Sequence, residues 1–112
     1  MDETITSESS VGKRLGKIQK EETLLLSYQG KTMSVTGTVT IGRDRDNSIY
    51  LDDQLVSRHH AVMQKIKMAF FVKDLSSKNG TYVNSRQIPK DKYVKLSSGD
   101  TIRVGRTELK IR

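Results

Sequence analysis

Three short polar segments carry residue types that could bind an anion. Gly42-Arg43 offers a guanidinium, Ser57-Arg58-His59-His60 offers a hydroxyl and a second guanidinium, and Ser77-Lys78-Asn79-Gly80-Thr81 offers an ammonium and a side-chain amide. Guanidinium, ammonium and hydroxyl groups all donate hydrogen bonds to phosphate oxygens, and an arginine fork matches a phosphate in charge and shape. The asparagine amide can pair with both the donor and the acceptor of an extended peptide backbone. These residue types suit the binding of a phosphate group.

The stretches around these segments read as β-strands. Apolar residues come in short runs that are separated by Gly, Asn, Asp and Ser at roughly ten-residue spacing, and no long helical pattern follows Thr23. Toward the C-terminus, apolar and polar residues alternate, which is typical of strands that bury one face. The predicted strands lie at 24–26, 38–41, 49–51, 61–63, 70–72, 81–83, 93–96, 101–104 and 107–111. The chain is therefore predicted to be all-β, a sandwich or a barrel with the polar segments at strand ends.

Two of the segments also have purely structural interpretations. Asn79-Gly80 between two strands is typical of a hairpin turn, because both residues tolerate a positive φ. His59 and His60 would face opposite sides of a strand, so they cannot hold a metal together. A histidine beside an apolar run is more often structural, and we expect no metal and no cofactor.

The third segment continues on both sides, as Asp74-Leu75-Ser76 before it and Tyr82-Val83-Asn84 after it. With these neighbours, the three segments closely resemble the signature of the forkhead-associated (FHA) family, whose domains bind phosphothreonine peptides. The resemblance covers the chain from the first strand to the C-terminus. It implies an FHA-like β-sandwich of about eleven strands in two sheets, with the binding loops at one end.

The resemblance also implies a role for individual residues. Arg43 and Ser57 are implied to contact the phosphate oxygens, and Asn79 to hold the peptide backbone. The full set of implied binding residues is Arg43, Ser57, Arg58, Lys78 and Asn79. Structural support of the binding loops is implied for Gly42, His60, Gly80 and Asn84. We expect Arg43 to be exposed, and we expect selectivity beyond the phosphate to lie in the loops at 52–55 and 85–90.

The composition limits the class of protein. The 112 residues fit one domain, and the absence of cysteine excludes disulfides and thiolate chemistry and is typical of a reducing compartment. No run approaches the roughly 18 apolar residues needed to span a bilayer. Asp2 and Glu3 stand where a signal peptide needs positive charge. We therefore expect a cytoplasmic protein without a membrane partner.

The charge leaves other binding classes open. The formal net charge is +7, and residues 23–112 hold 16 Lys and Arg against 8 Asp and Glu. A basic surface attracts nucleic acid as well as phosphorylated protein. The chain carries no motif that reads DNA or RNA, which argues against nucleic-acid binding. A basic nucleic-acid-binding domain or a phosphate-independent scaffold nevertheless remains the alternative function.

Catalysis is the remaining alternative. Ser57, His59 or His60, and Asp74 are the residue types of a hydrolase triad. However, the chain has no Gly-x-Ser-x-Gly elbow, no His-Glu-x-x-His pair and no phosphate-binding Gly-x-x-x-x-Gly-Lys loop. We therefore expect a protein that is not an enzyme.

Residues 1–21 are predicted to be a flexible polar tail before a domain at 22–112. The tail places Thr4 and Thr6 among acidic residues, as in a kinase target, and loosely resembles the phosphorylatable N-terminal segment of small bacterial FHA regulators. Those regulators carry adjacent threonines, whereas Ile5 separates the two here. The expected partners are a phosphothreonine-containing protein, a Ser/Thr protein kinase or its substrate, and the chain's own phosphorylated tail.

Overall fold

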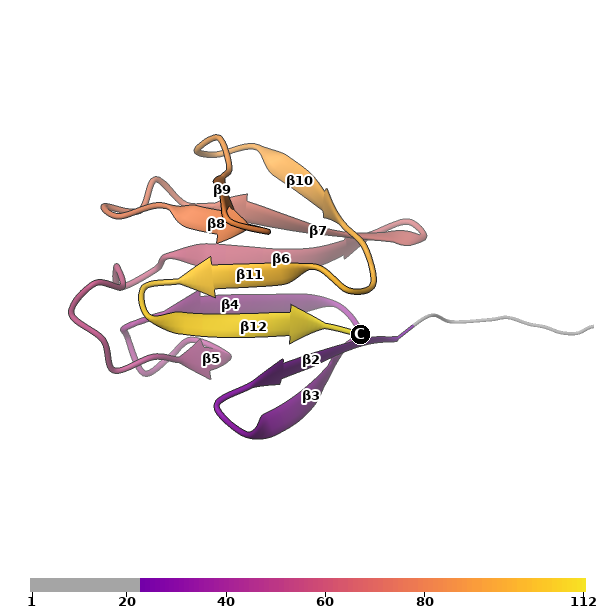
Figure 1. The fold of residues 1–112 in the computed structure, drawn as a ribbon, viewed down its shortest axis with the longest axis horizontal. Coiled ribbons are helices and arrows are strands. Elements are labelled where there is room, and N and C mark those ends of the chain that lie inside the picture. Colours follow the sequence, from indigo (N-terminus) through magenta and orange to yellow (C-terminus); the bar gives the residue numbers. More distant parts are fainter. Residues whose placement is uncertain (1–22) are drawn as a thin grey trace, which may run out of the picture.

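The computed structural model describes residues 23–112, so the expectations for the tail, including Thr4 and Thr6, lie outside the described residues. The described part contains eleven strands and no helix. The strands form one five-stranded and one six-stranded sheet, which face each other as two layers (Figure 1). The predicted all-β sandwich of two sheets is confirmed. Residues 23–112 also contain no helix long and apolar enough to cross a membrane.

The five-stranded sheet carries the strands on both sides of the first and second polar segments and the strand before the third. All of its pairings are antiparallel except the one between its last two members. In spatial order the strands are β10 (Tyr93–Leu96), β7 (Ala69–Asp74), β6 (Ala61–Ile66), β4 (Thr38–Gly42) and β5 (Ile49–Tyr50).

The six-stranded sheet is antiparallel throughout. In spatial order its strands are β3 (Lys31–Val35), β2 (Leu24–Tyr28), β12 (Thr107–Ile111), β11 (Thr101–Val104), β8 (Thr81–Val83) and β9 (Arg86–Gln87).

The core lies between the two sheets because apolar residues alternate along the strands. In β12, for example, Thr107, Leu109 and Ile111 are buried, whereas Glu108 and Lys110 are exposed. Successive side chains of a strand point to opposite faces, so the buried set of each sheet meets the other sheet. The fully buried apolar side chains include Leu26, Ile41, Met63, Ile102 and Leu109. Each such side chain stabilises the fold by about 1.5–3 kcal/mol relative to exposure.

Two strands and one connection differ from the sequence-based expectations. The strands β3 and β9 were not predicted; each lies at an edge of the six-stranded sheet, and Val35 is the only fully buried residue in either. The interpretation of Asn79-Gly80 as a hairpin turn is wrong, because β7 and β8 belong to different sheets. The segment crosses between the layers, and of this pair only Gly80 has a positive φ, of 86°.

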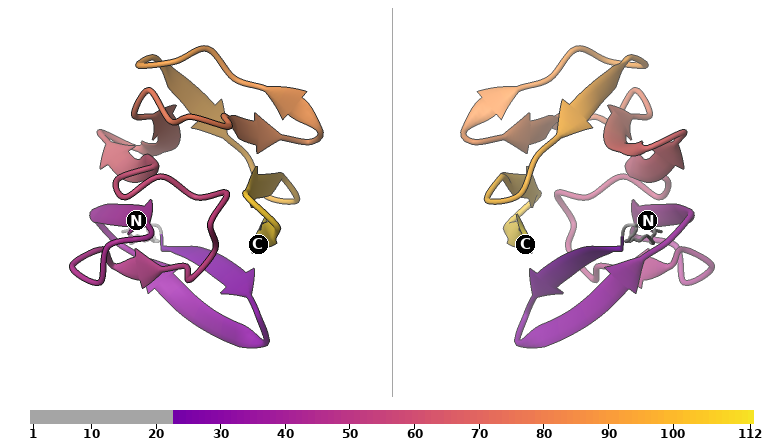
Figure 2. Two further views of the ribbon diagram at one scale, coloured as in Figure 1. Left: turned by 90° about the vertical axis from the view of Figure 1, so that its left-hand side faces the viewer. Right: turned by 90° about the vertical axis from the view of Figure 1, so that its right-hand side faces the viewer.

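Strand direction brings the three polar segments to one end of the sandwich. β4 and β7 end there, whereas β6 and β8 begin there, on the left in Figure 1. The left panel of Figure 2 looks onto this end, and the loops between these strands face the viewer. β2 begins and β12 ends at the opposite end of the molecule.

Candidate functional site

Gly42 brings the first and second polar segments into contact. A Cβ atom at this position would lie 2.0 Å from the carbonyl oxygen of Arg58 and 2.7 Å from Nδ2 of Asn47. Only glycine fits such a close approach. The backbone N–H of Arg43 then donates to Ser57 O at 3.0 Å, which locks the end of β4 against the loop before β6.

Arg43 is half-buried, so the expectation that it is exposed is wrong. The cause is the loop that Gly42 admits, because Arg43 Nε donates to the carbonyl oxygen of Val56 at 2.9 Å. The terminal nitrogens of the guanidinium make no hydrogen bond within residues 23–112. The side chain is thus held by one nitrogen while the other two remain available to an anion.

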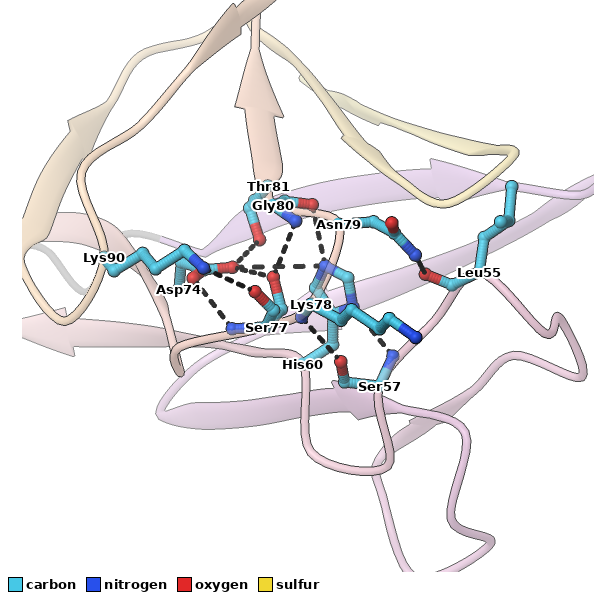
Figure 3. Close-up of polar contacts among 10 residues, drawn as sticks. All are labelled: Leu55, Ser57, His60, Asp74, Ser77, Lys78, Asn79, Gly80, Thr81 and Lys90. Atoms are coloured by element: carbon cyan, nitrogen blue, oxygen red, sulfur yellow. Dashed lines mark hydrogen bonds and ion pairs between the residues drawn. The ribbon is translucent and has the colours of Figure 1, made fainter.

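His60 joins the second segment to the third. Its ring is fully buried. The backbone N–H of Ser57 donates to Nδ1 at 3.0 Å, so Nδ1 carries no proton and Nε2–H donates to Gly80 O at 2.9 Å (Figure 3). Burial lowers the pKa of His60, which agrees with a neutral ring. The histidine therefore holds both loops through their backbones.

Ser57, His60 and Asp74, the residue types of a hydrolase triad, do not form the hydrogen-bonded chain of a catalytic triad. Ser57 Oγ accepts a hydrogen bond from the backbone N–H of Lys78 at 3.0 Å, and the histidine nitrogen nearest Ser57 binds its backbone instead. His60 Nε2 lies 4.0 Å from Asp74 Oδ1, beyond hydrogen-bond range, because Gly80 O takes its proton. A nucleophile and its base need a direct hydrogen bond, which these side chains do not make. They brace the loops.

Asp74, at the end of β7, holds the third segment in place through hydrogen bonds. Its fully buried carboxylate accepts hydrogen bonds from the hydroxyls of Ser77 and Thr81 and from the backbone N–H of Ser77. Ser77 Oγ in turn accepts the N–H of Gly80 at 2.9 Å, and Lys90 Nζ donates to Ser77 O at 2.9 Å. A buried charge needs several such donors. The sequence contains a signal for this arrangement, because an aspartate followed by serines, as in Asp74 to Ser77, is typical of a turn stabilised by side-chain hydrogen bonds.

Lys78 and Asn79 lie at the exposed tip of this braced loop. Asn79 Nδ2 donates to Leu55 O at 2.9 Å, as Figure 3 shows. The amide oxygen and the second amide proton make no hydrogen bond within residues 23–112. The Lys78 ammonium is likewise without a hydrogen bond in the described part of the chain. Both side chains therefore offer polar groups to a ligand.

A shallow pocket of about 250 Å³ lies between the three segments. It is lined by Arg43, Gln54, Leu55, Val56, Ser57, Lys78 and Asn79. Four of the five expected binding residues thus come together, whereas Arg58 is exposed outside this lining. The expectation that selectivity lies at 52–55 had pointed to Gln54 and Leu55, but nothing in the sequence had singled out Val56.

Asn84, expected to shape the binding loops, does not line this pocket, and its side chain contacts a different part of the fold. It follows β8, at the strand end away from Gly80, with a φ of 51°. Its Nδ2 donates to Asp100 Oδ1 at 2.9 Å, and its Oδ1 accepts from the N–H of Thr101 at 3.0 Å. Asn84 therefore fixes the β8–β9 turn to the start of β11.

His59 is exposed whereas His60 is buried, although both precede β6 and strand alternation does not apply to them. His59 Nε2 lies 3.4 Å from Asp44 Oδ2. The ligand atoms of Asp44, Asp46 and His59 all lie within 4.8 Å of one another, and the group is the only one of three or more His, Cys, Asp or Glu residues that could hold a metal in the part of the chain the structure describes. It lies outside the pocket lining.

Two facing sheets with a preset, cation-rich loop cluster at one end define a small β-sandwich binding domain. The model of the FHA domain family matches residues 39–105, which is more than half of the chain. The chain belongs to the FHA domain family.

Relatives and solved structures agree with this assignment. The oxoglutarate dehydrogenase inhibitor of Corynebacterium diphtheriae is 44% identical over 72 residues, which are 64% of this chain and 48% of that protein. The glycogen accumulation regulator GarA of Mycolicibacterium smegmatis is 43% identical over 72 residues, 64% of this chain and 44% of that protein. A solved FHA domain, from work on phosphothreonine-dependent FHA domain interactions, superposes with a TM-score of 0.73 at 32% identity, covering 81% of this chain and 96% of that one. The chain spans about half the length of these two relatives.

Proposed function

We propose that this chain is a phosphothreonine-dependent protein–protein interaction module that acts as an adaptor or regulator in Ser/Thr kinase signalling, without catalysis. The observation that carries the proposal is the convergence of Arg43, Ser57, Lys78 and Asn79 around one polar pocket. Three loops at one end of the sandwich supply these residues, and buried hydrogen bonds hold the loops before any ligand arrives.

The unpaired donors account for binding of a phosphate. The residues that carry these donors, Arg43, Ser57 and Lys78, all line the pocket. A hydrogen bond between charged groups contributes about 1.5–3 kcal/mol net. Two or three of them contribute about 3–9 kcal/mol in total, compared with the roughly 8 kcal/mol of a micromolar complex. Hydrogen bonds from Asn79 to the peptide main chain add to this.

The proposed partner is a phosphothreonine-containing protein, either a Ser/Thr kinase or a kinase substrate. The names of the relatives describe an enzyme inhibitor and a regulator of glycogen accumulation. A module that binds a phosphorylated segment fits both kinds of role, because binding changes the accessibility or the assembly of the target. Which enzyme or pathway this chain controls follows from its phosphopeptide preference.

Self-capture of a phosphorylated tail is part of the proposal. β2 begins at the end of the sandwich opposite the pocket, so a tail phosphorylated at Thr4 or Thr6 must run along the domain to reach it (Figure 1). A strand of six residues spans roughly 20 Å. The residues from Thr6 to Thr23 span up to roughly 50 Å when extended, so the reach is sufficient. A captured tail competes with other phosphopeptides at high effective concentration.

The tail experiment compares loop resonances in phosphorylated wild type and in a Thr4→Ala, Thr6→Ala double variant treated with the same kinase. Self-capture predicts shifts at Ser57 and Lys78 in the wild type alone. Identical spectra would exclude capture through these two threonines.

A further inference from the structure

Asp53 links the loop that lines the pocket to a turn of the other sheet. Its side chain is only 10% exposed. Oδ1 accepts the N–H of Leu55 at 2.9 Å, and Oδ2 accepts the N–H of Arg106, in the β11–β12 turn, at 2.9 Å. Arg106 Nη1 lies 3.4 Å from Oδ1. These backbone hydrogen bonds lower the pKa of Asp53, which is therefore a carboxylate at neutral pH.

The loop that Asp53 fixes holds two of the proposed binding residues. The carbonyl oxygen of Leu55 accepts Nδ2 of Asn79 at 2.9 Å, and the next carbonyl oxygen, of Val56, accepts Nε of Arg43 at 2.9 Å. The N–H of Val56 donates to Asp53 O at 2.9 Å, so the loop from 53 to 56 closes on itself. Two successive carbonyls therefore set the positions of the guanidinium and the amide.

The β11–β12 turn packs directly on this loop. A Cβ atom at Gly105 would lie 2.6 Å from Asp53 Oδ2 and 2.6 Å from Val56 Cγ2. Gly105 also has a φ of +61°, a conformation that other residues rarely adopt. The glycine therefore allows the turn to reach the carboxylate.

Resting on the function proposed above, we propose that Asp53 is a positioning residue for the phosphopeptide, which holds the Leu55 and Val56 carbonyls so that Asn79 and Arg43 face the pocket in a fixed arrangement. The β11–β12 turn, through Gly105 and the N–H of Arg106, is the anchor of this arrangement. Asp53 itself does not contact the ligand.

The charge of Asp53 and its positioning role predict opposite effects of Asp53→Asn on phosphopeptide affinity. A negative carboxylate near the pocket repels phosphate, so removing its charge by Asp53→Asn would strengthen binding if only charge mattered. Asparagine keeps one acceptor oxygen and loses the other, so one of the two backbone N–H groups loses its partner. If position matters, the loop relaxes and binding weakens despite the lost repulsion.

The test measures affinity for one phosphothreonine peptide, selected on the wild type, in Asp53→Asn and in Asp100→Asn. Asp100 also accepts hydrogen bonds with both oxygens, from Ser97 N at 2.8 Å and from Asn84 Nδ2 at 2.9 Å, but in the β10–β11 turn at the opposite end. We expect about tenfold weaker binding for Asp53→Asn and unchanged binding for Asp100→Asn. We also expect the Arg43 Nε and Asn79 Nδ2 resonances of the free protein to move in Asp53→Asn alone. Equal or tighter binding by folded Asp53→Asn would overturn the proposal.

A second pair of variants disturbs the same loop while leaving the Asp53 side chain chemically unchanged. Gly105→Ala and Gly99→Ala both place alanine at a positive φ, of +61° and +94°, but a Cβ at Gly99 meets nothing within 4 Å. Backbone strain is therefore common to both, and only Gly105→Ala displaces the loop. Weaker binding by Gly105→Ala alone supports the proposal, and equal affinities contradict it. A wild type that binds no phosphothreonine peptide would remove the proposed function itself, whereas a binding wild type with unaffected variants removes only the role of Asp53.

Discussion

His60 Nε2 and the carbonyl oxygen of Gly80 lie 2.9 Å apart although 20 residues separate them in the chain. This hydrogen bond joins the loop before β6 to the loop before β8, and the Ser57 N–H on the other ring nitrogen completes the link. The geometry of the pocket thus depends on a fully buried residue that is not part of the pocket lining.

The first prediction concerns the neutral ring of His60 and pH. Burial lowers the pKa of the folded-state histidine, so below the unfolded value of about 6.5 the unfolded chain binds the proton more readily. The stability that the neutral ring contributes is present in full above about pH 6.5 and is lost as the pH falls toward the folded-state pKa. We expect urea unfolding to give a lower free energy at pH 5.5 than at pH 7.5.

Two variants separate His60 from other titrating groups. His60→Gln is expected to be less stable at pH 7.5 but to show a smaller loss of stability between the two pH values. His59→Gln, at an exposed neighbouring position, should keep the wild-type dependence. The same pH dependence in all three proteins would show that His60 is not the titrating group.

Gly42→Ala is expected to destabilise the domain by about 3 kcal/mol or more, because its Cβ would lie 2.0 Å from the Arg58 carbonyl oxygen. Gly37→Ala is the matched control, since a Cβ there meets nothing within 4 Å. Urea unfolding of the two variants checks this. Similar stabilities would mean that the β4 end and the Arg58 loop separate without cost.

Asp74→Asn should destabilise the fold by about 1–3 kcal/mol. The amide would replace one acceptor oxygen with a donor amid the hydroxyls of Ser77 and Thr81, so buried polar groups would lose their partners. Asp91→Asn, whose exposed carboxylate accepts the hydroxyl of Ser76, removes the same charge at the surface and should cost much less. Thermal or urea unfolding compares them, and an equal loss would contradict the bracing role of Asp74.

Most of the strands could be predicted from the sequence because the earlier ones contain short apolar runs and the C-terminal ones alternate apolar with polar residues. In β12 this alternation matches the burial of every second residue, and recognising it needs no knowledge of the neighbouring strands. The edge strands β3 and β9 were missed for the converse reason, since only Val35 among their residues is fully buried and polar side chains are accommodated there. The Asn79-Gly80 connection was ambiguous because a turn between sheets and a hairpin turn use the same residues.

The residues of the site could be predicted from the sequence, but the hydrogen bonds that position them could not. The motifs identified Arg43, Ser57, Lys78 and Asn79, which the fold brings to one pocket. The half-buried state of Arg43 depends on a carbonyl 13 residues away, and the anchoring of Asp53 depends on a turn 53 residues away. Hydrogen bonds to backbone atoms leave no signal in side-chain type, so such links emerge only from the folded chain.

The central claim is that Arg43 binds the phosphate of a phosphothreonine peptide. The most direct measurement is a calorimetric titration with matched phosphothreonine, phosphoserine and unphosphorylated peptide pools. Wild type is compared with Arg43→Gln and with Arg112→Gln, which removes the same charge at the opposite, C-terminal end of the sandwich. The account predicts binding of the phosphothreonine pool alone, loss of at least about tenfold in affinity for Arg43→Gln and no change for Arg112→Gln. Equal binding by Arg43→Gln, or equal binding of the unphosphorylated pool, would contradict it.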